Sequence, residues 1–317
     1  MPELRPYRPG DEQGIRELFS VCHGRPLPED VWRWRYWGQE GKPAIVDVAV
    51  DGGKVVAHLG SLPVTLSRGR ETTPAGLWVD LMVHPDYRNL TTFLDMAETN
   101  RRHCASAGAK IVFAFPNDRS YPVLKRMLGW KAIEEIDAFE APLAELKAPA
   151  AAARVETVSA FDLEYDALWR KLRPEGAFAG QRSADWLTWR FKRRPGARYD
   201  AWRARNKEGR LAGYLVAKVF DGPDGKVGDV LDFRSEDESA AGLWSAALES
   251  FRAAGVKTVS AWALKESPLF ARFAEWGLAP RGPRTHFAGR WTSDDETAPF
   301  PASGRDWSVS KGDSDVF

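Results

Sequence analysis

Apolar and polar positions follow two periods along this chain, the two-residue period of strands and the longer period of helices. Early on, a polar turn at 51–54 separates two apolar runs at 44–50 and 55–59. A polar turn between two apolar runs predicts a β-hairpin. Longer helix-like stretches follow at roughly 91–107 and 239–254. The mixture predicts an α/β fold.

The same pattern occurs twice. Residues 107–115 (AGAKIVFAF) align with residues 254–262 (AGVKTVSAW), and five of the nine positions are identical. Each segment is typical of a helix end with a glycine cap, followed by a buried strand. Other segments match in the same order: 30–36 with 185–191, 44–59 with 199–216, and 77–83 with 229–233. The repetition predicts an internal duplication.

The duplication predicts the domain organisation. We expect one domain at 1–146, a second at 155–290 and a tail at 291–317, with an exposed linker rich in alanine between the two domains. The alternative is that any two α/β segments look alike. The conserved order of the matched segments argues against it.

Composition limits the classes of function. The net charge of +1 gives no electrostatic reason to expect nucleic acid or an anionic membrane as partner. Cys22 and Cys104 are the two cysteines, too few for a disulfide scaffold, and fit a reducing compartment. The first residues show no apolar run typical of a signal peptide, and no stretch has the length of a membrane span. We therefore expect a cytoplasmic protein.

Three short motifs carry a resemblance to a known family. Residues 83–89 (VHPDYRN) are similar to the V-x-P-x-Y-R-G segment that leads into the pyrophosphate loop of GNAT acyltransferases. Residues 115–117 (FPN), followed by 128–130 (LGW), are similar to the asparagine and the Gly-Phe pair near the end of that domain. Residues 4–11 (LRPYRPGD) resemble its first strand and turn. The sequence therefore resembles the tandem type of the GNAT superfamily.

This resemblance covers the first copy directly and the second only through the repeat. It implies two tandem GNAT-like domains, each a twisted mixed sheet flanked by helices, with a degenerate second copy. It also implies transfer of an acetyl group from acetyl-CoA to a small-molecule amine, by direct attack of the deprotonated amine on the thioester. No spacing of His, Cys, Asp and Glu suggests a metal site. The oligomeric state cannot be inferred from these patterns.

The resemblance assigns cofactor contacts to two segments and one asparagine. Main-chain groups of 81–83 would hold the thioester arm. The segment 88–93 would hold the pyrophosphate, because free N–H groups and the positive dipole end at a helix N-terminus favour phosphate. Asn117 matches the family's cofactor-contacting asparagine, or it caps a turn. The expected cofactor-binding residues are Leu81, Met82, Val83, Arg88, Asn89, Leu90, Thr91, Thr92, Phe93 and Asn117.

The expected pyrophosphate loop departs from the family pattern R/Q-x-x-G-x-G/A. It contains no glycine, and Thr91 stands at the first glycine position. A β-branched residue resists the backbone shapes and the close approach that glycine permits. The hydroxyl groups of Thr91 and Thr92 offer donors to phosphate instead. The other interpretation is a plain N-cap on a helix that binds nothing.

Asp80 and Tyr121 are the candidate catalytic residues. Asp80 lies in an apolar strand, where partial desolvation would raise the pKa of its carboxyl and make it a better base. The alternative is a structural aspartate paired with an arginine, and Asp232 at the matching position of the second copy supports that alternative. In the family a tyrosine acts as the general acid. Lys125 occupies that position here, so Tyr121, one turn earlier, is the nearest substitute.

Other candidates have structural alternatives. His84 lies near the expected thioester and His58 beside the expected acceptor groove, although each fits a structural role. The aromatic pattern of 32–37 recurs in the second copy, which favours core packing over an acceptor-binding wall. The tail is either a disordered acidic segment or a segment anchored by Trp307 that brings Asp313 and Asp315 to the acceptor groove.

Two further functions stay open beside acyl transfer. The missing glycines and the missing tyrosine favour a non-catalytic tandem protein that binds a ligand or partner. Aminoacyl transfer from charged tRNA is disfavoured, because the chain has no strong basic excess.

Overall fold

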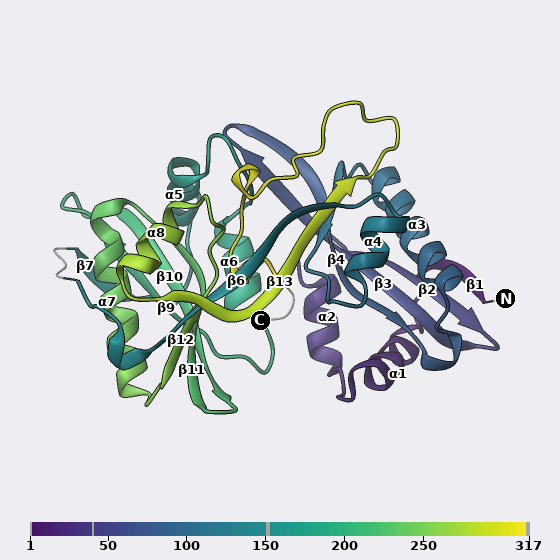
Figure 1. Ribbon diagram of the computed structural model, residues 1–317, viewed down its shortest axis with the longest axis horizontal. Coiled ribbons are helices and arrows are strands. Elements are labelled where there is room, and N and C mark those ends of the chain that lie inside the picture. Colours follow the sequence, from purple (N-terminus) through teal and green to yellow (C-terminus); the bar gives the residue numbers. More distant parts are fainter. Residues whose placement is uncertain (1, 40, 150–152, 315–317) are drawn as a thin grey trace. The chain divides into compact units, whose positions relative to one another are not determined.

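The computed structural model describes residues 2–39, 41–149 and 153–314 (Figure 1). The chain forms two compact units, each assembled from several segments. Unit 1 consists of Met1–Leu66, Thr72–Ile133 and His286–Ala302. Unit 2 consists of Ser67–Glu71, Glu134–Thr285 and Ser303–Phe317.

Unit 1 is built around a sheet with the strand order β1-β2-β3-β4-β5-β13. Its β1, β2 and β3 are antiparallel neighbours, whereas β4 and β5 run parallel. Its elements are β1 (Glu3–Pro6), α1 (Glu12–His23), α2 (Glu29–Trp37), β2 (Ile45–Asp51), β3 (Lys54–Arg68), β4 (Glu71–Val83), α3 (Leu90–Ser106), β5 (Ile111–Ala114), α4 (Tyr121–Met127) and the end of β13 (Ala279–Trp291).

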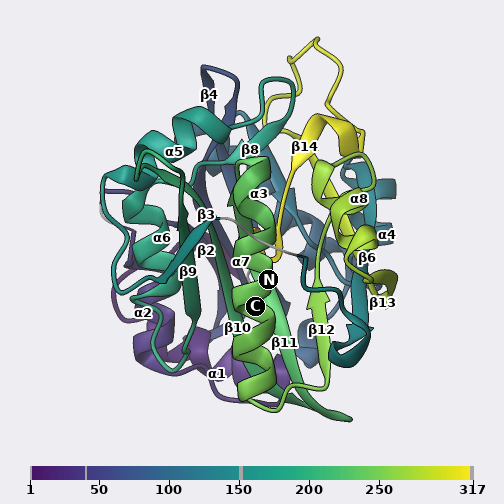
Figure 2. The same ribbon diagram turned by 90° about the vertical axis from the view of Figure 1, so that its left-hand side faces the viewer.

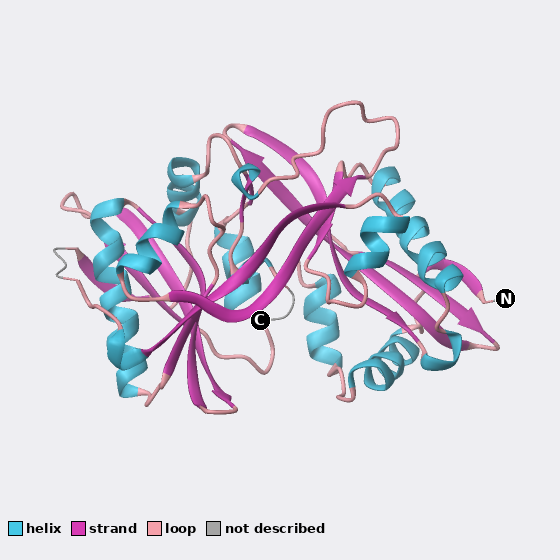
Figure 3. Ribbon diagram, in the orientation of Figure 1, coloured by secondary structure: helices cyan, strands magenta, loops and turns pink. Residues whose placement is uncertain are grey.

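Helices cover both faces of this sheet (Figure 3). On one face, α3 and α4 contribute Met96, Ala97 and Leu124 to a core with Val56 and Trp78 of the sheet. On the other face, α2 packs so closely on β3 that a Cβ at Gly60 would collide with the Tyr36 ring. The aromatic segment 32–37 thus contributes core residues, as expected, since Trp32 and Tyr36 are buried.

Unit 2 repeats this plan with the strand order β6-β12-β11-β10-β9-β7. Helix α7 lies across one face of β9 to β12 (Figure 2), and α5 and α6 contribute to a second core on the other face. Its elements are β6 (Lys131–Pro142), β7 (Arg154–Thr157), α5 (Glu164–Leu172), β8 (Phe178–Gly180), α6 (Ala184–Phe191), β9 (Asp200–Arg205), β10 (Leu211–Gly222), β11 (Gly225–Ser235), α7 (Asp237–Ala253), β12 (Thr258–Ala261), α8 (Pro268–Glu275) and β14 (Trp307–Ser308).

The repeat predicted from the sequence is present in the hydrogen bonds as well as in the order of elements. At the end of β4 the His84 N–H donates to the Val56 carbonyl, and after β11 the Glu236 N–H donates to the Ala212 carbonyl, both at 2.8 Å. The two residues follow Asp80 and Asp232 by the same four positions. These matching contacts confirm the α/β fold and its duplication.

Each repeat contributes its last strand to the sheet of the other repeat. Strand β6 follows α4 of the first repeat, yet residues 139–142 pair with 258–261 of β12. Strand β13 follows α8 of the second repeat, yet residues 288–291 pair with 111–114 of β5. Each compact unit therefore contains the last strand of the other repeat, so the units do not coincide with the repeats. The boundaries 1–146 and 155–290 of the sequence repeats stay a prediction.

The tail is divided between the two units: residues 291–302 belong to unit 1, and the described residues from 303 to 314 belong to unit 2. Two short 3₁₀ helices, Gly304–Asp306 and Lys311–Asp313, flank β14, which pairs in parallel with β8 through Trp307 and Phe178. The prediction of a disordered tail is therefore wrong for 304–314. Asp315 and the chain terminus lie outside the described residues. No helix within the described ranges is long and apolar enough to cross a membrane.

Candidate functional site

The parallel strands β4 and β5 of unit 1 are paired over only part of their length. The register pairs are Ala75 with Ile111, Gly76 with Val112, and Leu77 with Phe113. Beyond them β5 ends at Ala114, whereas β4 continues to Val83. We call residues 78–83, which neighbour β3 but extend past β5, the unpaired stretch of β4. Backbone N–H and C=O groups that point to the side of β5 need partners there, so this side is suited to a ligand.

A strained residue lies inside the unpaired stretch. Asp80 has a φ of 50°, and within the described ranges it is the sole non-glycine residue with positive φ. Such a conformation costs on the order of 1–3 kcal/mol and persists only where neighbouring groups enforce it. The backbone at Asp80 therefore depends on its contacts.

Three side chains hold Asp80 in place. From α2, the Arg35 guanidinium and the Tyr36 hydroxyl donate to Asp80 Oδ2, the latter at 2.6 Å. From β3, His58 Nδ1 lies 2.8 Å from the Asp80 carbonyl oxygen. A carbonyl only accepts, so Nδ1 carries the proton and Nε2 is the unprotonated nitrogen. This Nε2 is buried and has no hydrogen-bond partner among the described residues.

Electrostatics keep Asp80 ionised. Burial raises the pKa of its carboxyl, but the charge of Arg35 and the Tyr36 hydrogen bond outweigh it, so the pKa lies below the ordinary aspartate value. The expectation of a raised pKa is therefore wrong, because a sequence does not show that an arginine faces Asp80. The alternative pairing with an arginine is confirmed. Burial lowers the pKa of His58.

The expected pyrophosphate loop is an ordinary helix start. Asn89 is the N-cap of α3, and its side-chain oxygen accepts the Thr92 N–H at 2.8 Å. Thr91 lies in the first turn with negative φ, so the expected glycine-like backbone is absent at this residue. Leu90 and Thr91 are exposed, and in the described part of the chain no hydrogen bond is formed by their N–H groups.

The flanking residues of this loop are partly engaged. Arg88 is exposed and donates through Nε to the Val83 carbonyl at 3.1 Å, and Cys22 Sγ lies 3.5 Å from the same oxygen. Leu81, Val83 and Phe93 pack against the core beneath α3, and Met82 is buried. The expected cofactor segments 81–83 and 88–93 are thus continuous along one strand and the helix start that follows it.

Asn117 and Tyr121 lie at the start of α4. Asn117 Oδ1 accepts the N–H groups of Arg119 and Ser120 at 3.0 Å each, which makes Asn117 a turn cap. The Tyr121 ring stacks on His286, with centroids 3.9 Å apart and planes 11° apart. His286 Nε2 in turn lies 2.8 Å from Asp118 Oδ1. His286 was missed by the sequence analysis, because only the return of β13 brings it into unit 1.

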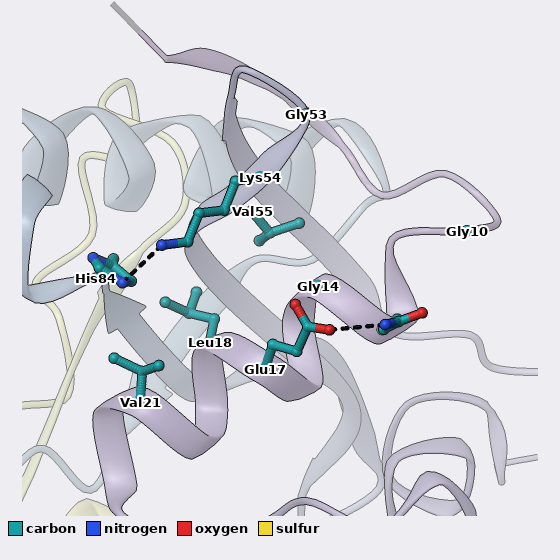
Figure 4. A pocket seen from close by; sticks show the side chains of 10 residues that line it. Gly10, Gly14, Glu17, Leu18, Val21, Gly53, Lys54, Val55 and His84 are labelled. Carbon is teal, nitrogen blue, oxygen red and sulfur yellow. Dashed lines mark hydrogen bonds between the residues drawn. The ribbon is translucent and has the colours of Figure 1, made fainter.

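A polar pocket of about 360 Å³ opens where the unpaired stretch ends (Figure 4). It lies between α1, the β2–β3 turn and His84. Lys54 Nζ is 3.0 Å from His84 Nε2, and on the α1 side Gln13 donates to Glu17 at 2.8 Å. His84 thus lines this pocket rather than the centre of the unpaired stretch. Within the described ranges, no three His, Cys, Asp or Glu residues form a group that fits a metal ion.

Comparison with known proteins shows what the chain is similar to. Residues 3–133 match the family model described as acetyltransferase (GNAT) domain. No curated protein matches the sequence. Among solved structures, a GCN5-related N-acetyltransferase from Anabaena variabilis superposes with a TM-score of 0.74 at 13% identity, over 92% of this chain and 73% of that one.

Two further structures show the same similarity. A GCN5-related N-acetyltransferase from Kribbella flavida gives a TM-score of 0.71 at 16% identity, over 92% of this chain and 71% of that one. A tandem GNAT protein from the clavulanic acid biosynthesis pathway gives 0.64 at 17% identity, over 93% of this chain and 100% of that one. Residues 3–133 are therefore similar to a GNAT domain, and the described chain has the fold of the tandem GNAT protein and of the other two structures.

Proposed function

We propose that unit 1 is an N-acyltransferase that moves the acetyl group of acetyl-CoA to the amine of a small molecule. One observation supports this most: a strained aspartate, an unpaired strand and an open helix N-terminus follow one another along residues 78–93. The GNAT fold and the matching family model support acyl transfer in general. A fold alone does not fix a reaction, so the argument rests on these residues.

The described residues fit acetyl-CoA as a substrate. In this proposal the N–H groups of Leu90 and Thr91 and the hydroxyls of Thr91 and Thr92 donate to the pyrophosphate, assisted by the positive end of α3. Arg88 adds positive charge at the same exposed place. Backbone groups of 81–83 bind the thioester arm. Asn117 is a weaker candidate, because its side-chain oxygen is already used as a cap.

In the reaction, the amine nitrogen forms a bond to the thioester carbon and the carbon–sulfur bond breaks. The amine loses a proton, and the coenzyme A thiolate takes one up. Neither bond to Asp80 Oδ2 occupies Oδ1, so we assign Oδ1 to accept the amine N–H and orient it. Because the pKa of Asp80 is lowered, proton removal then passes to solvent more readily than to this carboxylate. Tyr121 is the proposed proton donor to the thiolate.

The second candidate is a tandem GNAT-like protein that binds a ligand without catalysis. The lowered pKa of Asp80 and the capped, glycine-free helix start favour it. Both candidates predict acetyl-CoA binding or the binding of a related ligand, so turnover separates them.

Calorimetry with acetyl-CoA, followed by thiol release with a panel of primary amines, tests the proposal. Saturable binding with amine-dependent thiol release supports the acyltransferase. Binding without release against any amine of the panel supports the binding protein. Absence of binding at millimolar acetyl-CoA contradicts the assigned phosphate site and with it the acyltransferase.

A further inference from the structure

Unit 2 contains a counterpart of the unpaired stretch. The parallel pairs between β11 and β12 are Val227 with Thr258, Gly228 with Val259, and Asp229 with Ser260. Strand β12 ends at Ala261, but β11 continues to Ser235. Residues 230–235 are therefore the unpaired stretch of β11. The last pair in unit 2, Asp229 with Ser260, corresponds through the repeat to Leu77 with Phe113.

The tail of the same chain runs along this stretch. Arg234 donates to Ser308 Oγ at 2.9 Å, and Ser310 Oγ donates to Asp232 Oδ1 at 3.1 Å. Gly312 lies so close to β11 that an added Cβ would be 3.2 Å from the Leu231 carbonyl oxygen. The tail thus contacts β11 at several successive levels along its unpaired length.

Lys311 lies at the end of the unpaired stretch that adjoins the last strand pair. Its side chain is 4% exposed, and that of Asp229 is 1% exposed. Lys311 Nζ donates to Asp229 and, at 2.6 Å, to Ser260 Oγ. These are the two residues of the last strand pair. A buried charge requires a partner and further hydrogen bonds to offset its lost hydration, and the groove supplies both.

Two arginines of unit 2 hold the rest of the tail. Arg182, 1% exposed, donates to Asp232 at 2.6 Å and to Asp313 at 2.7 Å. Arg190 donates to the backbone carbonyls of Gly312 and Ser314 at 3.1 and 3.2 Å. A surface tail that packed by chance would not satisfy buried charges from three separate elements.

We propose that the unpaired stretch of β11, together with Asp229 and Ser260, is a lysine-binding groove, and that this chain's own tail, 307–314, is its resident ligand. The groove recognises the ammonium group of Lys311. The tail fills the place that matches the proposed thioester-arm site of unit 1. On the proposed function, the second repeat therefore leaves this place closed to acyl-CoA.

A peptide in trans tests the groove in the full-length protein. The probe is a fluorescently labelled peptide of residues 304–314, and a second peptide carries Lys311→Ala. The wild-type chain should bind neither peptide, because its own tail occupies the groove. The full-length double variant Lys311→Ala/Asp313→Ala, whose tail has lost both of its side-chain ion pairs, should bind the wild-type peptide saturably and the altered peptide at least about tenfold more weakly, as expected for loss of a charge-assisted hydrogen bond.

Two controls keep the result decisive. Lys207→Ala removes an exposed lysine of a turn in unit 2 and should bind peptide no better than wild type. A chain deleted after Ser303 should bind the wild-type peptide, if it folds, as judged by circular dichroism. Equal affinity for both peptides, or a folded double variant that binds neither, overturns the proposal. Acetyl-CoA is absent from this experiment, so failure of the proposed enzyme activity would leave its result unaffected.

Discussion

The central strand pair of unit 1 ends on Leu77 and Phe113, whereas that of unit 2 ends on Asp229 and Ser260. The backbone arrangement is the same at both places. In unit 1 this end is apolar and buried, while in unit 2 it carries a carboxylate and a hydroxyl that bind a lysine. The same backbone arrangement thus carries an apolar pair in unit 1 and a polar, lysine-binding pair in unit 2.

The two repeat-related aspartates show a second difference. Asp80 has positive φ and is held through both its carboxylate and its carbonyl. Asp232 is absent from the positive-φ residues of the described chain, and Arg182 and Tyr214 both bond its carboxylate. Tyr214 replaces His58 at the matching position of β10. Among the described non-glycine residues, the positive φ thus occurs in the aspartate of unit 1 and not in its counterpart in unit 2, which is consistent with the site proposed for unit 1.

The largest effect is expected from Asp80→Asn. If Asp80 orients the amine, turnover should fall by about 10²-fold, the cost of a misplaced reacting group. Affinity for acetyl-CoA should change little, because the proposal places the carboxylate beside the acceptor and not at the phosphate site. Steady-state kinetics with calorimetry measure both quantities.

The matched variant Asp232→Asn is the control for this prediction. It changes the same residue type in the same strand position of unit 2 and should leave turnover within a few fold of wild type. If Asp80→Asn and Asp232→Asn lower stability equally and neither affects turnover, Asp80 is structural and the two units do not differ in role.

Asp232→Asn should instead lower the free energy of unfolding. Removing one partner of a buried ion pair costs about 3–5 kcal/mol, and among the described residues Arg182 then keeps Asp313 as its charged hydrogen-bond partner. Chemical denaturation followed by tryptophan fluorescence measures the loss. The exposed Asp221→Asn should change stability by no more than about 0.5 kcal/mol. A similar small change for Asp232→Asn would contradict a stabilising role of the Arg182 cluster.

A smaller effect is expected at the helix start. Thr91→Val removes a hydroxyl and should weaken acetyl-CoA binding by about 10- to 150-fold, the equivalent of one hydrogen bond to a charged group. Thr91→Ser keeps the hydroxyl and should bind like wild type. Thr91→Gly should not improve binding, because Thr91 already has helical backbone angles. Tighter binding by Thr91→Gly would show that the threonine obstructs the phosphate.

The smallest effect is the change in the free energy of unfolding for each unit of pH. The pKa of Asp80 and that of Asp232 are lowered in the folded chain, the latter because Arg182 and its neighbours outweigh the effect of burial. Their stabilisation is complete above the unfolded pKa of about 3.9 and is lost as pH falls below it, by at most about 1.4 kcal/mol per pH unit for each group.

Thermal unfolding between pH 3 and pH 7 measures this loss, and the two asparagine variants provide the reference. Each variant should show a shallower decline below pH about 4 than wild type. Asp47 and Asp229 have raised pKa values through burial and act in the opposite direction, so the difference between variant and wild type is more informative than the wild-type curve. Parallel curves would contradict the lowered pKa values.

The sequence predicted the elements of this fold well because their signals are local. The helix expected at 91–107 is α3, Leu90–Ser106, and the turns at 51–54 and 206–209 join the expected hairpins. Apolar period, a glycine cap and a polar turn are read from neighbouring residues alone. The duplication followed from the same local signals.

The site was predicted less completely because its contacts are distant in sequence. Arg35 lies 45 residues from Asp80, and the two meet only when α2 packs on the sheet. That contact decides whether the pKa of Asp80 is raised or lowered, so the apolar strand sequence alone gave the wrong direction. His286 is 165 residues from Tyr121, and its position depends on the return of β13. No local pattern marks a strand exchange.

The exchanged strands set an order for synthesis and folding. The edge of β5, at 111–114, receives its partner only when 288–291 have been made. At about 5–20 residues per second, the ribosome needs roughly 10–30 s to pass from one segment to the other. During that interval an unpaired strand edge is exposed, which is a risk for wrong pairing between nascent chains. The first repeat is therefore translated first but completed last.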